Sequence, residues 1–149
     1  MQHLVQRTFI KEILTKYRTI AVIGLSRDPT KDSYKVSSYL KTMGYTIIPL
    51  NPYADQILGE KSYKNFFDMP SELKKRIEIV DVFRPSNVIP PIVEEVIKLR
   101  NKHGRPYVIW MQLNIINDLA AQKARNSGMQ VVMNRCMMVE HMRLFNEKS

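Results

Sequence analysis

The chain has 149 residues and a formal net charge of +9, with hydrophobic residues making up 44% of it and charged residues 25%. This length suits one domain, and this balance is that of a globular protein rather than of a disordered or fibrous one. A single cysteine, Cys136, excludes an internal disulfide framework and a multi-cysteine metal site, and it favours a reducing cytoplasm as the location. Residues 106–117 form an uncharged run that is too short and too polar to span a bilayer, and the first residues lack the pattern of a secretory signal.

Short apolar runs alternate with helical periodicity along the chain, and only residues 53–76 are hard to interpret. In chain order, with cap residues included, we expect a helix over 1–17, a strand over 19–23, a helix over 33–43, a strand over 46–50, a helical turn within 71–76, a strand over 77–83, a helix over 86–103, a strand over 107–111, a helix over 117–127, a strand over 130–133 and a helix over 139–145.

Cap and breaker residues support these helix boundaries. Ser33 is the candidate N-cap of the second helix, and Asn117 is the candidate N-cap of the helix that follows residues 107–111. Pro90 and Pro91 fall in the first turn of their helix, where a missing amide donor does least harm. Gly104 then ends that helix.

Strands that are unbroken apolar runs, each followed by a helix, are typical of a parallel sheet covered on both faces. With right-handed crossovers the sequence predicts a single α/β domain of Rossmann-like, doubly wound architecture, with a mainly parallel five-stranded sheet. In such sheets ligands bind beyond the carboxyl ends of the strands. The stretches that this rule selects are residues 24–34, 51–53, 83–88, 111–114 and 134–137.

The first stretch has the chemistry of a phosphate site. Gly24 allows a tight turn, and the N-terminus of the following helix presents free amides to an anion. Arg27, Lys31 and Lys35 add positive charge around it. The dinucleotide fingerprint G-x-G-x-x-G is absent, because Ser26 stands at the second glycine position, and so is the phosphate loop that ends in Gly-Lys-Ser/Thr. A plain strand-to-helix connection is the alternative interpretation.

The next stretches carry weaker signals. Asn51 and Pro52 follow the second strand, where a nicotinamide-binding protein carries an acidic residue for the ribose, so hydride transfer is disfavoured. Phe83 and Arg84 have the chemistry to hold a purine or a phosphate, and the alternative is a core phenylalanine beside a solvated arginine. Gln112 places a neutral amide at the end of the fourth strand.

No catalytic or metal-binding constellation stands out. His3, His103 and His141 share no metal-ligand spacing, so no metal site is expected. Cys136 follows Arg135, a cation that favours the reactive thiolate, and the alternative for a lone cysteine is a small buried hydrophobic residue.

Several short motifs agree in order and spacing with one known family. These motifs are residues 21–26 (AVIGLS), 33–36 (SYKV), 48–52 (IPLNP), 57–60 (ILGE), 79–84 (IVDVFR), 110–113 (WMQL), 132–136 (VMNRC) and 140–141 (EH). Together they resemble the small stand-alone CoA-binding proteins, relatives of the CoA-binding domain of the succinyl-CoA synthetase α subunit. The resemblance covers residues 8–145.

The resemblance implies a Rossmann-like sheet that holds CoA over its carboxyl edge. The implied contacts are Gly24, Leu25, Ser26 and the Ser33 helix start for the pyrophosphate; Asn51 and Pro52 for the ribose and its 3′-phosphate, with Lys31 or Lys35 nearby; Phe83, Arg84 and Val88 for the adenine; and Met111, Gln112 and Cys136 for the pantetheine arm. Arg27 and Tyr34 are further expected cofactor-binding residues, without an assigned part of the ligand. The chain lacks the ligase domain of the synthetase, so the resemblance implies binding rather than acyl-CoA synthesis.

Two residues depart from the family pattern. Asp32 stands where a proline is common and places a negative charge near a polyanionic ligand. Asn114 stands where a glycine is usual, although asparagine tolerates the left-handed backbone region. We expect both departures to weaken CoA binding without changing the fold.

The leading functional hypothesis is a non-catalytic CoA- or acyl-CoA-binding protein, acting as a carrier, a sensor or a redox-linked binder in which the CoA thiol forms a mixed disulfide with Cys136. The alternatives are a nicotinamide- or acyl-CoA-dependent enzyme with an unrecognised site and, in third place, a nucleic-acid-binding module suggested by the net charge of +9. No membrane partner is expected. A homodimer is compatible with the sequence, because closed two-fold pairs are the commonest assemblies.

Overall fold

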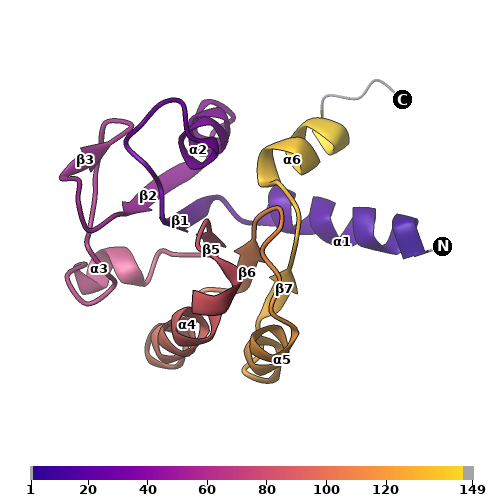
Figure 1. Cartoon of the computed structure of the whole chain (residues 1–149). Coiled ribbons are helices and arrows are strands. Elements are labelled where there is room, and N and C mark those ends of the chain that lie inside the picture. Colours follow the sequence, from indigo (N-terminus) through magenta and orange to yellow (C-terminus); the bar gives the residue numbers. More distant parts are fainter. Residues whose placement is uncertain (1, 146–149) are drawn as a thin grey trace.

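A five-stranded parallel sheet organises the chain in the computed structural model, which describes residues 2–145 (Figure 1). Its strands, in spatial order, are β2 (Thr46–Leu50), β1 (Thr19–Ile23), β5 (Ile79–Val82), β6 (Val108–Met111) and β7 (Gln130–Val132). Every neighbouring pair is parallel. The central strands are buried on both faces, which explains why they have no polar alternation in the sequence. The predicted α/β fold class is confirmed.

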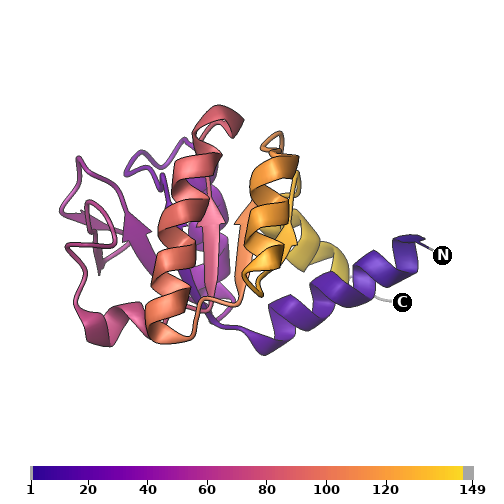
Figure 2. The same cartoon turned by 90° about the horizontal axis from the view of Figure 1, so that it is seen from below.

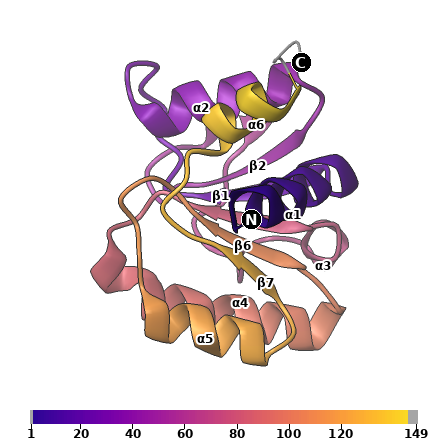
Figure 3. The ribbon, with the colours of Figure 1, turned by 90° about the vertical axis from the view of Figure 1, so that its right-hand side faces the viewer.

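Helices cover both faces of this sheet (Figure 3). They are α1 (Gln2–Lys16), α2 (Asp32–Thr42), α3 (Ser71–Lys74), α4 (Ile89–His103), which follows the 3-10 turn Ser86–Val88, α5 (Asp118–Asn126) and α6 (Met137–Phe145). Helices α4 and α5 pack on one face, and α1, α2 and α6 pack on the other. Figure 2 shows α1 extending past the β7 side of the sheet.

Alternation along the strands divides the core into two clusters. Val80 and Val82 of β5 point to the α4–α5 face, whereas Ile79 points to the face covered by α1, α2 and α6. On this second face Trp110 is fully buried, and its indole N–H donates a 2.8 Å hydrogen bond to the carbonyl of Arg135. The tryptophan thus fixes the chain that leaves β7.

The helix boundaries agree with the sequence in most places. Asn117 caps α5, because its side chain accepts the N–H of Ala120, and Pro90 lies in the first turn of α4 as expected. The expectation for α2 was wrong, since its N-cap is Lys31, without a side-chain cap bond. The Ser33 hydroxyl instead accepts the N–H of Ser26, so it joins the preceding loop to the helix. Helix α6 begins at Met137, two residues before the expected start.

Residues 53–76, whose sequence shows no clear periodicity, form a small antiparallel hairpin, and the chain then returns to the sheet. The hairpin pairs β3 (Gln56–Ile57) with β4 (Glu60–Lys61) through a turn at Leu58 and Gly59, both with positive φ. Beyond it, Tyr63 pairs with Leu50 in a parallel bridge beside β2. This return places residues 64–66 next to the carboxyl end of β2.

The strand order defines where the direction of winding reverses. From β1 the chain crosses to β2 on one side, and then passes to β5 on the other side of β1. The switch point therefore lies between the carboxyl ends of β1 and β5, where open α/β sheets bind ligands. Among residues 2–145, every helix is too short or too polar to cross a membrane.

Candidate functional site

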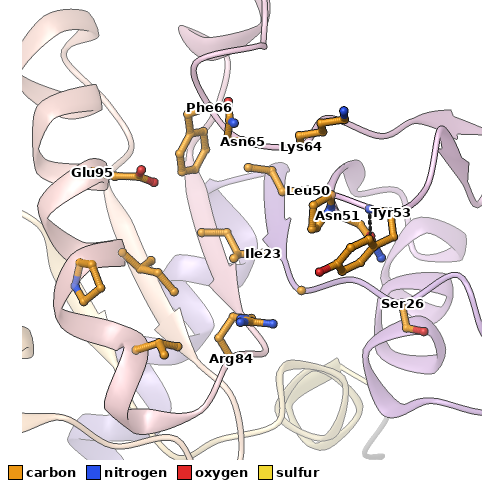
Figure 4. A pocket seen from close by; sticks show the side chains of 15 residues that line it. Ile23, Ser26, Leu50, Asn51, Tyr53, Lys64, Asn65, Phe66, Arg84 and Glu95 are labelled. Carbon is orange, nitrogen blue, oxygen red and sulfur yellow. Dashed lines mark hydrogen bonds between the residues drawn. The ribbon is translucent and has the colours of Figure 1, made fainter.

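A pocket of about 450 Å³ lies at the carboxyl ends of β1 and β2, against α4 (Figure 4). This volume falls in the range of small-molecule sites. Five segments of the chain form its wall. They are the end of β1 with the loop that follows it, the end of β2 with the loop that follows it, residues 64–66, the loop after β5, and the first turns of α4. Apolar side chains, among them Ile23, Leu50 and Ile92, form part of the lining. The pocket therefore borders the switch point.

Gly24 holds the ends of three strands together. Its φ is +85°, its N–H donates to the carbonyl of Leu50 at 3.1 Å, and an added Cβ would lie 2.9 Å from the carbonyl oxygen of Phe83. A side chain at this position would push the ends of β1 and β5 apart. The expectation that a glycine makes the tight turn after the first strand is confirmed.

The loop after Gly24 is held by its own side chains. The Ser26 N–H donates to the Ser33 hydroxyl at 2.9 Å, and the Ser26 hydroxyl accepts the N–H of Asp28 at 3.0 Å. Asp28 in turn accepts both the N–H and the hydroxyl of Thr30, and these hydrogen bonds lower the pKa of its carboxyl group. Ser26 lines the pocket, and its hydroxyl hydrogen is left as a donor toward a ligand.

Asn51 connects two loops through its side-chain amide. Its Nδ2 donates to the carbonyl of Leu25 at 2.8 Å, and its Oδ1 accepts the N–H of Tyr53 at 2.7 Å (Figure 4). Nicotinamide-binding sheets use the residue at this position to accept the ribose hydroxyls. Asn51 offers one acceptor oxygen, already bonded to the Tyr53 N–H, where an acidic residue offers two, so this position suits a ribose of a nicotinamide cofactor less well.

Two cations face the pocket without protein partners. Arg84 and Lys64 both line it and are exposed, and neither has an ion pair or a side-chain hydrogen bond within residues 2–145. Glu95, from α4, is the one carboxylate among the described lining residues. Unpaired cations at the mouth of a pocket attract anionic ligands and bind phosphate oxygens strongly.

The structure brings some of the predicted site residues together and places the others elsewhere. Those that line the pocket are Gly24, Ser26, Asn51, Pro52, Arg84 and Val88. Those outside its lining are Leu25, Arg27, Lys31, Ser33, Tyr34, Lys35, Phe83, Met111, Gln112 and Cys136. The side chains of Leu25 and Met111 are fully buried, and Phe83 packs against the cluster under α1, α2 and α6. Ligand contact by this second group stays a prediction.

Gln112 faces the core rather than the open edge. Its Nε2 donates a 2.5 Å hydrogen bond to Oδ1 of Asp81, and its Oε1 accepts the N–H of Met137, the first residue of α6. Asp81 is fully buried, and its Oδ2 has no partner among the described residues. Burial raises the pKa of Asp81 to about 7, against the opposing effect of the Gln112 bond. Gln112 thereby ties β5 to the start of α6, beside Cys136.

The remaining loops at this edge are joined by asparagine and serine side chains. Asn114 has a φ of +69°, which confirms that an asparagine can hold the left-handed conformation at this position. Its N–H donates to Oδ1 of Asn134 at 2.7 Å, and the Ser86 hydroxyl accepts the N–H of Ile116 at 3.0 Å. Three loops of the carboxyl edge are thus fixed relative to one another.

Sequence reasoning missed several residues of the wall. Lys64, Asn65 and Phe66 come from the segment without periodicity, and no local pattern marks them, whereas Tyr53 lies in the selected stretch 51–53 but was not named as a site residue. Glu95 did have a signal, because Val88 was expected at the site and helical spacing places residues 91, 92 and 95 on the same face. Within residues 2–145 no three His, Cys, Asp or Glu side chains form a group that could hold a metal ion.

A family model described as a CoA binding domain matches residues 18–142. The chain belongs to the CoA-binding domain family. This match confirms the resemblance of the sequence motifs, and it includes every segment of the pocket wall while leaving α1 outside.

Relatives of known sequence fall in two groups. The uncharacterised protein YneT of Bacillus subtilis is 38% identical over 132 residues, which cover 89% of this chain and 91% of that protein. The ADP-forming acetate–CoA ligase of Methanocaldococcus jannaschii is 32% identical over 78 residues, which cover 52% of this chain and only 10% of the ligase. The family member described here therefore matches a small part of that ligase.

Solved structures share the fold over almost the whole chain. A hypothetical protein from Pyrococcus horikoshii is 39% identical with a TM-score of 0.81, and the match covers 93% of this chain and 91% of the other. A protein from Thermus thermophilus is 32% identical with a TM-score of 0.82, covering 93% and 98%. These similarities agree with the five-stranded architecture.

Proposed function

We propose that the protein binds CoA or an acyl-CoA in the pocket at the carboxyl edge of the sheet and does not itself catalyse a reaction. The observation that carries this proposal is a pocket with two unpartnered cations, Arg84 and Lys64, at the switch point of a CoA-binding domain. CoA carries about four negative charges, from a pyrophosphate and a 3′-phosphomonoester whose second pKa is near 6. The charge and position of the pocket suit such a ligand.

The pyrophosphate is assigned to the loop after β1. Gly24 brings the backbone close to the ligand, the Ser26 hydroxyl can donate to a phosphate oxygen, and the Arg84 guanidinium lies on the neighbouring wall. A planar guanidinium can bond two phosphate oxygens at once. Arg27, Lys31 and Lys35 lie outside the lining, where they add long-range attraction.

The side chains of the pocket support a binding role without catalysis. Acid–base chemistry needs a donor and an acceptor group near the reacting atoms. Glu95 is the single carboxylate among the described lining residues, and no histidine or cysteine joins it there. We accordingly propose a carrier, a sensor or a redox-linked binder. With one cysteine in the chain we place it in the cytoplasm, and a homodimer is compatible with the sequence.

The test is isothermal titration at near-neutral pH with CoA, dephospho-CoA and NAD in parallel. We expect CoA to bind most tightly, dephospho-CoA more weakly because it lacks the 3′-phosphate, and NAD least. Arg84→Met should weaken CoA about tenfold, the size of a hydrogen bond between charged groups. Arg125→Met, which removes the same charge from the exposed surface of α5, should leave CoA affinity unchanged. Absence of heat with both CoA and a long-chain acyl-CoA would overturn the proposal.

A further inference from the structure

The pocket has two chemically different ends. In Figure 4, Ser26 and Tyr53 lie at one end, whereas Glu95 projects from α4 toward the ring of Phe66 at the other. Glu95 comes six residues after Ile89, the first residue of α4, so it lies about 9 Å along the helix from the carboxyl edge. The second end of the pocket therefore lies more than one helical turn along α4 from the carboxyl edge.

The negative charge of a carboxylate is unfavourable in a pocket that binds a polyanion, so the position of Glu95 needs an explanation. Glu95 is exposed, and within residues 2–145 its carboxylate has neither an ion pair nor a hydrogen bond. It would repel a phosphate group placed beside it. This end therefore favours a part of the ligand that carries no negative charge and donates a hydrogen bond, because an ionised carboxylate can only accept.

The neighbours of Glu95 favour a flat heterocycle. Phe66 presents a buried aromatic ring, and Ile92 adds an apolar surface from α4. Asn65 accepts the N–H of Asp68 through its Oδ1, which leaves its amide N–H groups as donors. Together, Glu95 and Asn65 supply an acceptor and a donor next to an aromatic face.

This pattern complements adenine. Adenine presents its 6-amino group as a donor beside the N1 acceptor, whereas guanine and hypoxanthine present the reverse order, an oxygen acceptor at position 6 beside an N1–H donor. We propose that Glu95 is the specificity-determining residue for the base, accepting a hydrogen bond from the 6-amino group of the adenine of CoA. The assignment rests on the proposed CoA-binding function. Against a 6-oxo base the Glu95 carboxylate would face another acceptor, so the discrimination has a repulsive part as well.

The experiment compares CoA with its 6-oxo analogue, in which hypoxanthine replaces adenine, by isothermal titration. We expect the wild-type protein to prefer CoA by about 10- to 100-fold, the effect of one hydrogen bond to a charged group. Glu95→Gln should reduce this preference to about threefold or less, because the new amide can donate to the 6-oxygen. Since Glu95 is exposed, this variant should unfold at the wild-type temperature.

The adjacent acid of the same helix gives a matched control. Glu94 forms an ion pair with Lys123 of α5 and lies outside this pocket, so Glu94→Gln removes the same charge and should keep the wild-type preference. If Glu95→Gln weakens CoA and the 6-oxo analogue equally, or changes neither, the assignment of Glu95 to the base is overturned while CoA binding stands. If the wild-type protein binds neither ligand, the proposed function fails as well.

Discussion

Asp81 is a fully buried carboxylic acid in the middle of β5, between two core valines. Burial raises its pKa from an ordinary value near 3.8 to about 7, because an ionised carboxylate loses its hydration inside the protein. Between these two pH values the folded protein binds a proton that the unfolded chain does not bind. Stability must therefore rise as the pH falls through this window.

We expect the free energy of unfolding to gain on the order of 4 kcal/mol from this group between pH 7 and pH 4, since one pKa unit corresponds to about 1.4 kcal/mol. Asp81→Asn cannot ionise, so its advantage over the wild type should be largest at pH 8 and should vanish near pH 4. Urea unfolding at several pH values measures this difference. The exposed Asp55→Asn is the control, and parallel curves for wild type and Asp81→Asn would contradict the buried-acid interpretation.

Alanine substitutions at Gly24 and Gly44 distinguish the cost of backbone strain from the cost of a steric clash. Both have positive φ, but an added Cβ meets the Phe83 carbonyl at 2.9 Å in the first case and nothing within 4 Å in the second. Gly44→Ala should cost about 1 kcal/mol from the left-handed conformation alone. Gly24→Ala should cost more and should also weaken CoA, because it separates β1 from β5. Equal losses of stability in thermal unfolding would show that the strand ends are not in tight contact.

At the level of elements, α1 belongs to the core although it precedes the segment matched by the family model. Ile13 and Leu14 are fully buried in the cluster under α1, α2 and α6, and the Tyr45 hydroxyl donates to the carbonyl of Leu14. Residues 10, 13, 14 and 17 are spaced as one face of a helix, and this is the face that packs against the sheet. The helix thus closes one side of the sheet.

Leu14→Ala should lower the free energy of unfolding by about 2–5 kcal/mol, the range for deleting a buried leucine side chain. Val5→Ala, on the exposed side of the same helix, should change it by less than about 0.5 kcal/mol. Chemical denaturation of both variants measures the two effects. A small loss for Leu14→Ala would mean that α1 can detach without cost to the rest of the fold.

Periodicity was enough to locate every strand of the main sheet and the helices that cover it, because buried strands and amphipathic helices leave regular patterns. It was not enough for β3 and β4, which have two residues each and no alternation to detect. One side of the pocket wall comes from the non-periodic return at residues 64–66, whose position depends on the Tyr63 bridge to Leu50. Ser33 is not the N-cap of α2 because its hydroxyl accepts the N–H of Ser26 in the preceding loop, and capping rules do not predict a bond to that loop.

For the whole molecule, the net charge of +9 left a nucleic-acid-binding alternative open. A protein that contacts 6–10 phosphates of DNA loses about 10³- to 10⁵-fold in affinity between 50 and 200 mM salt. CoA meets only a few cations in the pocket, so we expect its affinity to fall by about tenfold or less over the same range. Titration at the two salt concentrations, with a gel-shift assay in parallel, distinguishes the cases. Strong retardation of DNA with a steep salt dependence would favour the alternative.

The return of the chain at Tyr63 also affects how the molecule meets other copies of itself. An uncovered edge strand is a template for intermolecular strand pairing and aggregation. On the outer side of β2, Pro49 has no N–H to offer, its carbonyl accepts the N–H of Tyr63, and the N–H of Asn51 bonds to the carbonyl of Tyr63. At the opposite edge β7 has only three residues. The segment that forms a wall of the pocket therefore also blocks the longer edge of the sheet against growth into fibrils.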